Sequence, residues 1–470
     1  MQGKQYALGI DFGTTTLSGA LVDVETWQIK TAHVETHAYL AFSDSSRREQ
    51  SITRLDGCFD RLLDTLLPGN GSAIISVGLT GQMHGVIGLD AQHRPATNLV
   101  TWQDRSGDGR LSNGKTLLEE MRDRSPGLRI SNGYGLATLF KWKVVQQHQE
   151  VQSFCTVPDY FGMGISGDCA PCIDPSMAHS VGGYDVLAGD WDREVLRRLG
   201  LDGVAFPEVT ASPCLRGKVQ CDRILERSTQ KNIPVAVAIG DNQASFLGTV
   251  DDPQNSLLVN MGTGSQISHT IGRSELSAFS HRMDGLDTEL RPLMQDMFLV
   301  ATCITSGGTV YRCLHDFFLE CGESLFGLNR SAINDGLWEH MEACGDRAAN
   351  DGGLNVTPRF DGSRSDPTAR GTIGGISLAN LTPGNLIRAT LCGIAQYHKS
   401  FVPAEILSRV RCIYGSGNGL KKNRLLRQAF EEAFGRTLAL SGHDEEAAVG
   451  AAMAGEWTLL GRRPCPRWER

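Results

Sequence analysis

The chain has 470 residues, of which 40% are hydrophobic, and its mean hydropathy of −0.20 is typical of a folded globular protein. A formal net charge of −8, from 45 basic and 53 acidic residues, argues against a general nucleic-acid binder. No apolar run is long enough to span a bilayer, so we expect neither a membrane nor a nucleic-acid partner.

The N-terminus and the cysteines favour a cytoplasmic protein. The first residues, MQGKQYALGID, run into an acid too early for a secretion signal. Thirteen cysteines follow no disulfide framework, so we expect reduced thiols. Cys169 and Cys172 have the spacing of a redox or metal pair, but no second pair or histidine cluster completes a zinc site.

The first part of the chain reads as a mixed α/β domain. Tyr6–Ile10 and Ser18–Val24 are short β runs, Leu55–Leu67 has helical spacing, and Ala73–Leu79 is a strand. Strand, turn and helix signals in this order are typical of α/β folds.

The rest of the chain continues the pattern, and 470 residues exceed one ordinary core. We expect two domains, 1–246 and 247–470, that meet in the stretch DNQASFLGTVDDP. The expected helices are Ala137–Gln149, Asp192–Leu199, Ile387–Phe401 and Asn423–Phe434, and the expected strands are Pro234–Ile239, Leu257–Val259 and Val410–Tyr414.

One motif occurs in both halves. GIDFGTTT at Gly9–Thr16 is repeated as LVNMGTGS at Leu258–Ser265: a β run, Asp or Asn, one apolar residue, Gly-Thr, a small residue and a hydroxyl. Two copies in the same context indicate a duplicated fold that holds one ligand. Two ordinary hairpin turns are the alternative.

Both turns suit a phosphate. Glycine permits close approach, successive N–H groups form an anion-binding nest, and hydroxyls add donors without charge. The chain has no G-x-x-x-x-G-K-[ST] motif, so we do not expect a P-loop. The candidate phosphate residues are Gly13, Thr14, Thr15 and Thr16 in the first turn, and Gly262, Thr263, Gly264 and Ser265 in the second.

A third glycine-rich stretch, GSGNG at Gly415–Gly419, lies between an expected strand and an expected helix. Such a turn lets a flat group lie against the backbone, and adenine is a sensible occupant. Its candidate residues are Gly415, Gly417 and Asn418. A tight strand-to-helix connection explains the glycines nearly as well.

Two acids stand at the ends of apolar runs. Asp241 follows Ile239-Gly240, and a carboxylate there can accept a proton from a sugar hydroxyl as its oxygen attacks phosphorus. Asp11 precedes the first turn and can hold Mg²⁺ directly or through water. For each acid, a helix-capping or turn-forming role is the alternative.

Planar polar groups and an aromatic face are typical of sugar sites, and two stretches supply them. GQMHG and LVTWQDR place Gln82, His84, Trp102, Gln103 and Asp104 at the ends of apolar runs. A structural histidine and a core tryptophan remain the alternatives.

Taken together, the motifs resemble the FGGY carbohydrate kinases from about Tyr6 to Gly455. The resemblance is carried, in chain order, by GIDFGTTT, GLTGQMHG, DYFGMGISG, DPSMAHSVGGYD, IGDNQAS, NMGTGS, ARGTIGGIS and GSGNGLKKNRLLRQAF. It implies two ribonuclease H-like α/β domains around a deep cleft, an N-terminal sugar-binding domain and a C-terminal nucleotide-binding domain. Several family members form dimers, so a homodimer is possible by analogy.

The resemblance also implies roles for individual residues. Asp241 matches the catalytic base, and Asp11 the acid near the phosphates, with Mg²⁺ near both. Gly13–Thr16, Gly262–Ser265 and Gly415–Asn418 match the loops for ATP. The implied sugar residues are Gln82, Met83, His84, Trp102, Asp104, Tyr134, Asp241 and Asn242.

Within the family, NLVTWQDRS, GYGLATLF and GDNQAS are most similar to sedoheptulokinases. Leu139 stands where many members carry a lysine, a departure that favours a ketoheptose. The expected reaction is therefore the phosphorylation of sedoheptulose to sedoheptulose 7-phosphate by ATP. A xylulokinase, another pentulose or polyol kinase, and a non-catalytic sugar sensor are the alternatives.

Overall fold

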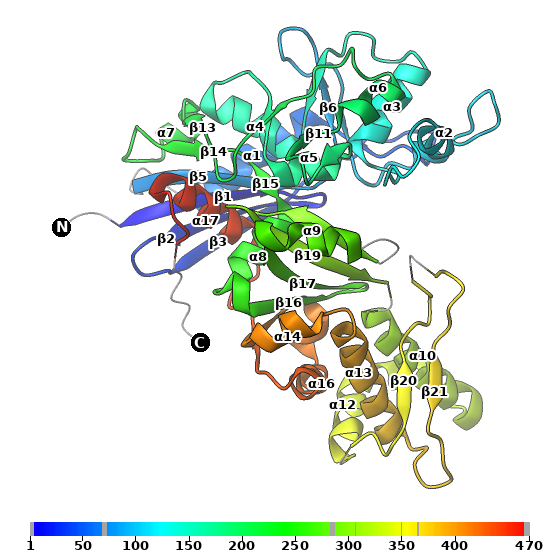
Figure 1. Ribbon diagram of the computed structural model, residues 1–470. Helices are drawn as coiled ribbons and strands as arrows, with labels where there is room; N and C mark the ends of the chain where they lie inside the picture. The colour runs from blue at the N-terminus through cyan, green and yellow to red at the C-terminus, as the bar shows by residue number, and fades with distance from the viewer. Residues whose placement is uncertain are drawn as a thin grey trace. The chain divides into compact units, whose positions relative to one another are not determined.

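The computed structural model describes residues 4–67, 73–282, 287–305, 307–348, 350–363 and 366–464, and it forms two compact units (Figure 1). The first unit comprises Met1–Asp251, Arg291–Phe298 and His443–Glu469. The second comprises Asp252–Leu290 and Leu299–Gly442. The final helix of the chain thus belongs to the same unit as the N-terminal strands.

The first unit is built on a seven-stranded mixed sheet. Strand β1 (Gln5–Phe12) pairs antiparallel with β2 (Thr16–Asp23) and parallel with β5 (Ala73–Gly81). The order is β13-β14-β5-β1-β2-β3, with β15 also paired to β5; these further strands are β3 (Ile29–Glu35), β13 (Leu215–Lys218), β14 (Pro234–Ala236) and β15 (Ile239–Gly240).

Alternation along β2 divides its side chains between two helices. Leu17 and Leu21 lie in the core that includes helix α1 (Ile52–Leu66), whereas Ala20 and Val22 pack with Ala448 and Val449 of helix α17 (Glu446–Leu460). Successive side chains of a strand point to opposite faces, so each face of the sheet is covered by its own helix.

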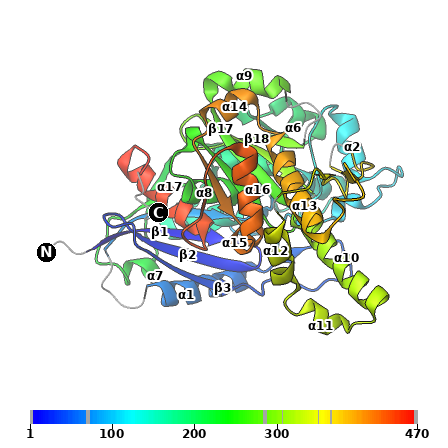
Figure 2. The ribbon, with the colours of Figure 1, turned by 90° about the horizontal axis from the view of Figure 1, so that it is seen from below.

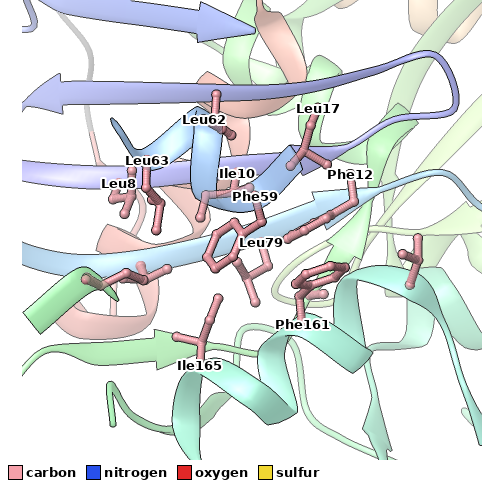
Figure 3. Packing of buried hydrophobic residues seen from close by; sticks show 14 of the residues in the cluster. Leu8, Ile10, Phe12, Leu17, Phe59, Leu62, Leu63, Leu79, Phe161 and Ile165 are labelled. Carbon is pink, nitrogen blue, oxygen red and sulfur yellow. The ribbon is translucent and has the colours of Figure 1, made fainter. Parts of the chain in front are cut away.

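The α1 side of the sheet has an aromatic centre (Figure 3). Phe12 of β1 stacks on Phe161 of helix α4 (Val157–Ser166) with 4.3 Å between ring centroids, and Phe59 of α1 contacts both rings. All three rings are buried. This cluster anchors the end of β1, directly before the first glycine–threonine turn.

A second hydrophobic cluster of the first unit lies around Phe140, Phe154 and Trp191. Its helices are α2 (Leu117–Arg124), α3 (Gly135–Val144), α5 (Pro175–Val181) and α6 (Arg193–Leu199); α7 (Asp222–Leu225) and α8 (Asp241–Thr249) also belong to this unit. The short strands of the first unit are β4 (Glu49–Gln50), β6 (Ile87–Leu89), β7 (Leu99–Val100), β8 (Ser153–Cys155), β9 (Cys172–Ile173), β10 (Tyr184–Asp185), β11 (Asp190–Trp191) and β12 (Glu208–Val209).

The second unit repeats the strand arrangement of the first. Strand β16 (Ser256–Met261) pairs antiparallel with β17 (Ser265–Gly272) and parallel with β22 (Cys412–Ser416), as β1 does with β2 and β5. The sheet order is β18-β19-β17-β16-β22-β23, with β18 (Thr288–Pro292), β19 (Met297–Ile304) and β23 (Leu438–Leu440).

Helix α13 is the central helix of the second unit's helical part. Helix α13 (Pro383–Lys399) contacts both α12 (Leu337–Arg347) and α16 (Arg424–Phe434) (Figure 2). The others are α9 (Arg273–Arg282), α10 (Gly308–Phe326), α11 (Arg330–Asn334), α14 (Ala404–Arg409) and α15 (Asn418–Lys422), with the hairpin β20 (Asn355–Thr357) and β21 (Thr372–Gly374).

Most expected elements are confirmed within a few residues, and two differ. The helix expected over Ala137–Gln149 ends at Val144, because Gln146 and His148 adopt positive φ angles of 54° and 52° that an α-helix does not accommodate. The strand expected over Pro234–Ile239 is interrupted and forms β14 and β15, which both pair with β5. Among the described residues, no helix is both long and apolar enough to cross a membrane.

Candidate active site

The first glycine–threonine turn connects β1 to β2. A Cβ on Gly13 would lie 2.6 Å from the carbonyl oxygen of Thr16, so the turn closes this tightly only with glycine. Among the described residues, the N–H groups of Thr14 and Thr15 donate to no backbone carbonyl. The turn therefore presents donors of the kind that an anion requires.

Three side chains hold the same turn, two of them at the carbonyl of Thr14 and one at its hydroxyl. Gln50 Nε2 donates to Thr14 O at 2.6 Å, and Thr36 Oγ1 donates to Thr14 O at 3.1 Å. The indole Nε1 of Trp102 donates to Thr14 Oγ1 at 2.9 Å. Gln50 and Thr36 do not stand out in the sequence, because neither belongs to a motif with a recognisable spacing.

Asp11 and Asp241 interact electrostatically in the first unit. Burial and the nearby carboxyls of Asp241 and Glu445 raise the pKa of Asp11 to about 8. Burial also raises the pKa of Asp241 to about 6, while the backbone N–H of Asn242 and the guanidinium of Arg291 act in the opposite direction. The two carboxyls therefore lie close enough to influence each other, and their roles toward metal and substrate stay a prediction.

Asp241 is the first residue of α8 and follows directly on β15. The preceding residue is held in place by the chain of α5: Gly240 N donates to Ser176 Oγ at 3.0 Å, and that hydroxyl donates to Asp174. On the other side, Arg291 Nη1 donates to Asn242 Oδ1 at 2.9 Å. The sequence does not indicate a role for Arg291, because this residue lies in a hairpin about fifty positions further along the chain.

Three of the expected sugar residues follow β5 directly. The Gln82 side chain is buried and donates from Nε2 to Gln50 Oε1 at 2.9 Å. Met83 lies against Gly240, next to Asp241. His84 has a positive φ of 73°, donates from Nδ1 to Ser180 O at 2.6 Å, and stacks on Tyr134 with 4.4 Å between ring centroids.

Trp102 and Asp104 differ in what they offer a ligand. Trp102 is 46% exposed although its indole nitrogen is bonded to Thr14, so it is not the core tryptophan of the alternative interpretation. Asp104 is buried and accepts hydrogen bonds from Arg48 N and from both the N–H and the hydroxyl of Ser106. These hydrogen bonds show that Asp104 stabilises the conformation of its own loop. Its contact with a sugar stays a prediction.

The second glycine–threonine turn connects β16 to β17 and is also supported at its carbonyls. Gly308 N donates to Gly262 O at 3.1 Å and Thr309 N donates to Thr263 O at 3.2 Å, so the first turn of α10 holds it. A Cβ on Gly308 would collide with Gly262 O. The lack of a side chain at Gly308 therefore allows α10 to approach the turn closely, a role that the sequence alone does not indicate.

Ser265, the last residue of that motif, has a partner within the protein. His398 is fully buried, donates from Nδ1 to Ile394 O at 2.7 Å, and its Nε2 lies 2.8 Å from Ser265 Oγ. Burial lowers the pKa of His398 to about 4, so the ring is neutral at pH 7 and Nε2 accepts the Ser265 proton. The serine hydroxyl donor expected to face a phosphate thus donates to His398 instead.

Two expected loops of the second unit meet in one cavity of about 830 Å³. Its lining includes Gly262 and Thr263 of the second turn, together with Gly417, Asn418 and Gly419. Gly417 has a φ of 84°, and a Cβ there would lie 2.6 Å from Met261 O. The glycine-rich stretch therefore lies closely against the end of β16, as a backbone surface that a flat ligand can approach.

Gly415 does not line this cavity. It lies within β22, where a Cβ would come within 2.8 Å of Leu438 Cδ2, so its glycine is explained by packing. Gly264 and Ser265 line a second cavity of about 510 Å³, which shares Gly262 and Thr263 with the first.

The large cavity also contains residues that the sequence reading did not single out. Trp338 is 40% exposed and stacks on His315 with 4.1 Å between ring centroids, and Tyr311 packs beside it. Both Trp338 and Tyr311 line the cavity, as does the cation Lys422. An aromatic wall and a lysine add apolar and cationic surface to the glycine-rich loops.

The described residues contain no group of three or more His, Cys, Asp or Glu side chains arranged to hold a metal ion. Cys172, of the pair noted in the sequence, accepts a hydrogen bond from Arg216 Nη1 at 3.1 Å. Asp11 Oδ1 is buried and has no hydrogen-bond partner among the described residues. An unsatisfied carboxyl oxygen beside a second carboxyl suits Mg²⁺, whose charge would favour the ionised form of Asp11 and which proteins commonly bind through one or two carboxylates plus substrate phosphates.

Both α/β units contain the same strand–turn–strand arrangement, and the first carries the acids Asp11 and Asp241 while the second carries a glycine-lined cavity. The models of the FGGY family of carbohydrate kinases match residues 6–248 with the N-terminal domain and 257–459 with the C-terminal domain. The chain belongs to the FGGY family of carbohydrate kinases.

Among curated proteins, the chain is 25% identical to mouse sedoheptulokinase and 26% identical to human sedoheptulokinase, in each case over 96% of this chain and 98% of the relative. It is 20% identical to xylulose kinase of Haemophilus influenzae over 96% of this chain and 90% of the relative.

Among solved structures, xylulose kinase from Rhodospirillum rubrum matches with a TM-score of 0.76 and 18% identity, over 96% of this chain and 90% of that chain. These matches confirm the two-domain α/β fold expected from the sequence. Family membership makes the chain a carbohydrate phosphotransferase, and FGGY kinases use ATP as the phosphate donor.

Proposed function

We propose that this chain transfers the γ-phosphate of ATP to the terminal primary hydroxyl of sedoheptulose and releases sedoheptulose 7-phosphate and ADP. The sugar is inferred from the mouse and human sedoheptulokinases, which align over 96% of the chain, and from the motifs NLVTWQDRS and GYGLATLF.

The observation that carries the proposal is the environment of Asp241. Its pKa of about 6 leaves the carboxyl ionised at neutral pH yet basic enough to accept a proton. It also begins a helix beside Asn242, whose amide oxygen is held by Arg291. A general base needs both a suitable pKa and a fixed position, and Asp241 has the two.

The nucleotide is assigned to the loops of the second unit. The cavity between Gly262–Thr263 and Gly417–Gly419 offers backbone close to a flat base and N–H groups for phosphates. In the first unit, the Thr14 and Thr15 N–H groups and the hydroxyls of Thr15 and Thr16 would bind the phosphoryl group that is transferred. Gln82, Met83, His84, Trp102, Tyr134 and Asn242 are assigned to the sugar.

Asp11 and Asp241 are the residues that would hold Mg²⁺, and the unsatisfied Oδ1 of Asp11 fits this role. A bound Mg²⁺ neutralises charge on the phosphate oxygens. Asp241 orients the sugar hydroxyl and takes its proton, while the turn at Gly13–Thr16 in the same unit holds the phosphoryl group that is transferred. Phosphoryl transfer depends mainly on such alignment and charge stabilisation.

A coupled ADP-release assay with sedoheptulose, xylulose, ribulose, apulose, gluconate and glycerol tests the proposal. We expect the highest kcat/KM with sedoheptulose. A higher value with xylulose or glycerol would keep the kinase and overturn the sugar. Sugar binding without ADP release from any sugar would instead identify a non-catalytic sensor.

Asp241→Asn tests the base. Removing a positioned general base costs about 10²–10⁴-fold in rate, so we expect kcat to fall by that factor while the Kd for ATP changes by less than about twofold. Asp192→Asn is the matched control, because Asp192 also begins a helix of the first unit, and asparagine retains its capping bonds. Wild-type kcat in Asp241→Asn would exclude Asp241 as the base.

A further inference from the structure

Gln50 connects two parts of the first unit that the proposed function assigns to different ligands. Its side chain is fully buried. It donates from Nε2 to Thr14 O at 2.6 Å and accepts at Oε1 from Gln82 Nε2 at 2.9 Å. Both ends of one amide are thus used, one toward the phosphate-type turn and one toward an expected sugar residue.

The two bonds fix the orientation of both amides. A backbone carbonyl can only accept, so the NH₂ of Gln50 must face Thr14 and its oxygen must face Gln82. The NH₂ of Gln82 then faces Gln50, and its oxygen points elsewhere. That oxygen, Gln82 Oε1, is buried and has no hydrogen-bond partner among the described residues.

An unsatisfied buried acceptor costs free energy that a donor from a ligand would recover. The hydroxyl of a sugar is such a donor. A hydroxyl that bonds to Gln82 Oε1 also polarises the amide and strengthens the bonds from Gln82 to Gln50 and from Gln50 to Thr14, because chains of hydrogen bonds reinforce one another.

The strand pair β4–β7 brings a second residue to the same point. Gln50 of β4 pairs with Leu99 of β7, and Trp102 follows β7 by two residues. Gln50 bonds the carbonyl of Thr14 and Trp102 bonds its hydroxyl. Two of the expected sugar residues, Trp102 directly and Gln82 through Gln50, therefore converge on one residue of the turn.

We propose that Gln50 is a positioning residue that links sugar binding at Gln82 to the conformation of the phosphate-type turn at Thr14. The inference rests on the proposed function for the identity of the two ligands. A sugar would tighten the turn before phosphoryl transfer, and an empty sugar site would leave it looser, which limits wasteful hydrolysis of ATP.

Gln50→Glu is the sharpest variant, since it keeps the size and the acceptor for Gln82 but replaces the donor to Thr14 with an oxygen. Hydrogen exchange of the peptide that covers Thr14–Thr16 is measured with and without sedoheptulose, or with whichever sugar the screen selects. In the wild type, sugar should slow this exchange by about fivefold or more, and Gln50→Glu should abolish the slowing.

Thr36→Val is the matched control. Thr36 donates to the same carbonyl but has no bond to Gln82, so its loss loosens the turn without breaking the link. We expect slowing by sugar to persist in Thr36→Val. If Gln50→Glu does not fold, Gln50→Met removes both bonds at similar length, and Gln82→Leu breaks the link from the other end.

The outcomes separate the two proposals. If a sugar is phosphorylated and Gln50→Glu keeps the sugar-dependent slowing, the link is wrong and the kinase stands. If sugar slows exchange in the wild type but not in Gln50→Glu, and no ADP is released, the link stands and the proposed activity fails. If no sugar changes the exchange of the turn in the wild type, the link is overturned whatever the assay shows.

Discussion

Several polar side chains in this protein form their hydrogen bonds with residues that are distant in the sequence. Arg291 donates to the amide oxygen of Asn242, and Gln50 forms hydrogen bonds at both ends of its amide. His398 accepts a hydrogen bond from the hydroxyl of Ser265. A motif shows which hydroxyls and amides are present, whereas these partners decide which way each one donates.

His398 leads to a pH-dependent prediction. Its folded-state pKa is about 4, below the ordinary value of 6.5, so at pH values between them the unfolded chain binds a proton that the folded chain rejects. The stability that neutral His398 permits is therefore full above pH 6.5 and is lost as the pH falls toward 4. Over that window the loss amounts to about 3 kcal/mol.

His398→Gln removes this titration. The unfolding free energies of wild type and variant, measured by urea denaturation, should differ most above pH 6.5 and converge or cross as the pH falls toward 4. His340→Gln, at an exposed position, is the control and should give a curve parallel to that of the wild type. Parallel curves for His398→Gln would contradict the assignment of a neutral, buried ring.

Each glycine–threonine turn is supported at its carbonyls by another element. Side chains of Gln50 and Thr36 hold the first turn, and the start of α10 holds the second. Glycine allows this close approach, as Gly13 and Gly308 show. At the level of elements, the turns are therefore built by contact with a support, and the hydroxyls alone do not shape them.

Gly417→Ala tests this requirement in the glycine-rich loop. The φ of 84° and the 2.6 Å approach to Met261 O both exclude a Cβ, so the loop must move. We expect the Kd of ATP to rise by about tenfold, which corresponds to 1.4 kcal/mol, with calorimetry as the measurement. The Kd of the sugar should stay within about twofold of the wild type.

Gly435→Ala provides the control for that variant. Gly435 lies in the same unit and also has a positive φ, of 63°, but a Cβ there would meet nothing within 4 Å. It should lose about 1 kcal/mol of stability from the strained backbone and bind ATP normally. Equal effects of the two substitutions on ATP binding would show that strain alone, and no loss of the loop surface, is responsible.

At the scale of the whole molecule, helix α17 closes the first unit with the end of the chain. Figure 1 shows it among the N-terminal strands, and it packs on α8, which begins with Asp241. The contacts are made backbone to backbone: a Cβ on Gly450 would collide with Ala244 O of α8, and one on Gly78 of β5 with Ala451 O. The position of Asp241 thus depends on a helix about two hundred residues further on.

Gly450→Ala should show this dependence. The added methyl has no room beside Ala244, so α8 and α17 must separate, at a cost of about 1–3 kcal/mol in unfolding free energy. We also expect a lower kcat, because Asp241 moves with α8. Thermal unfolding and the ADP assay give the two readouts.

Gly461→Ala is the control, since Gly461 ends α17 with a φ of 66° and a Cβ there would meet nothing within 4 Å. It should cost about 1 kcal/mol and leave kcat unchanged. A Gly450→Ala variant with wild-type stability would contradict the close packing of the two helices.

Much of the site could be predicted because its motifs are local. The turn after β1, its repeat after β16, and the acids Asp11 and Asp241 are each recognisable from a few consecutive residues, and the α/β fold follows from their order. Their roles toward ATP and sugar remain predictions. Gly415 shows the limit of local reading, since a glycine that packs in a strand looks the same as one that lines a cavity.

The sequence alone determined the repeated turns, the strand ends that carry the acids and the family, because glycine, hydroxyl and carboxylate requirements act within a few bonds of one another. Only the tertiary structure decided that Gln50, Arg291 and His398 support those residues, that Ser265 donates inward, and that α17 completes the first unit. Hydrogen bonds and close packing depend on distances in space, and the chain brings these partners together across separations that no local pattern records.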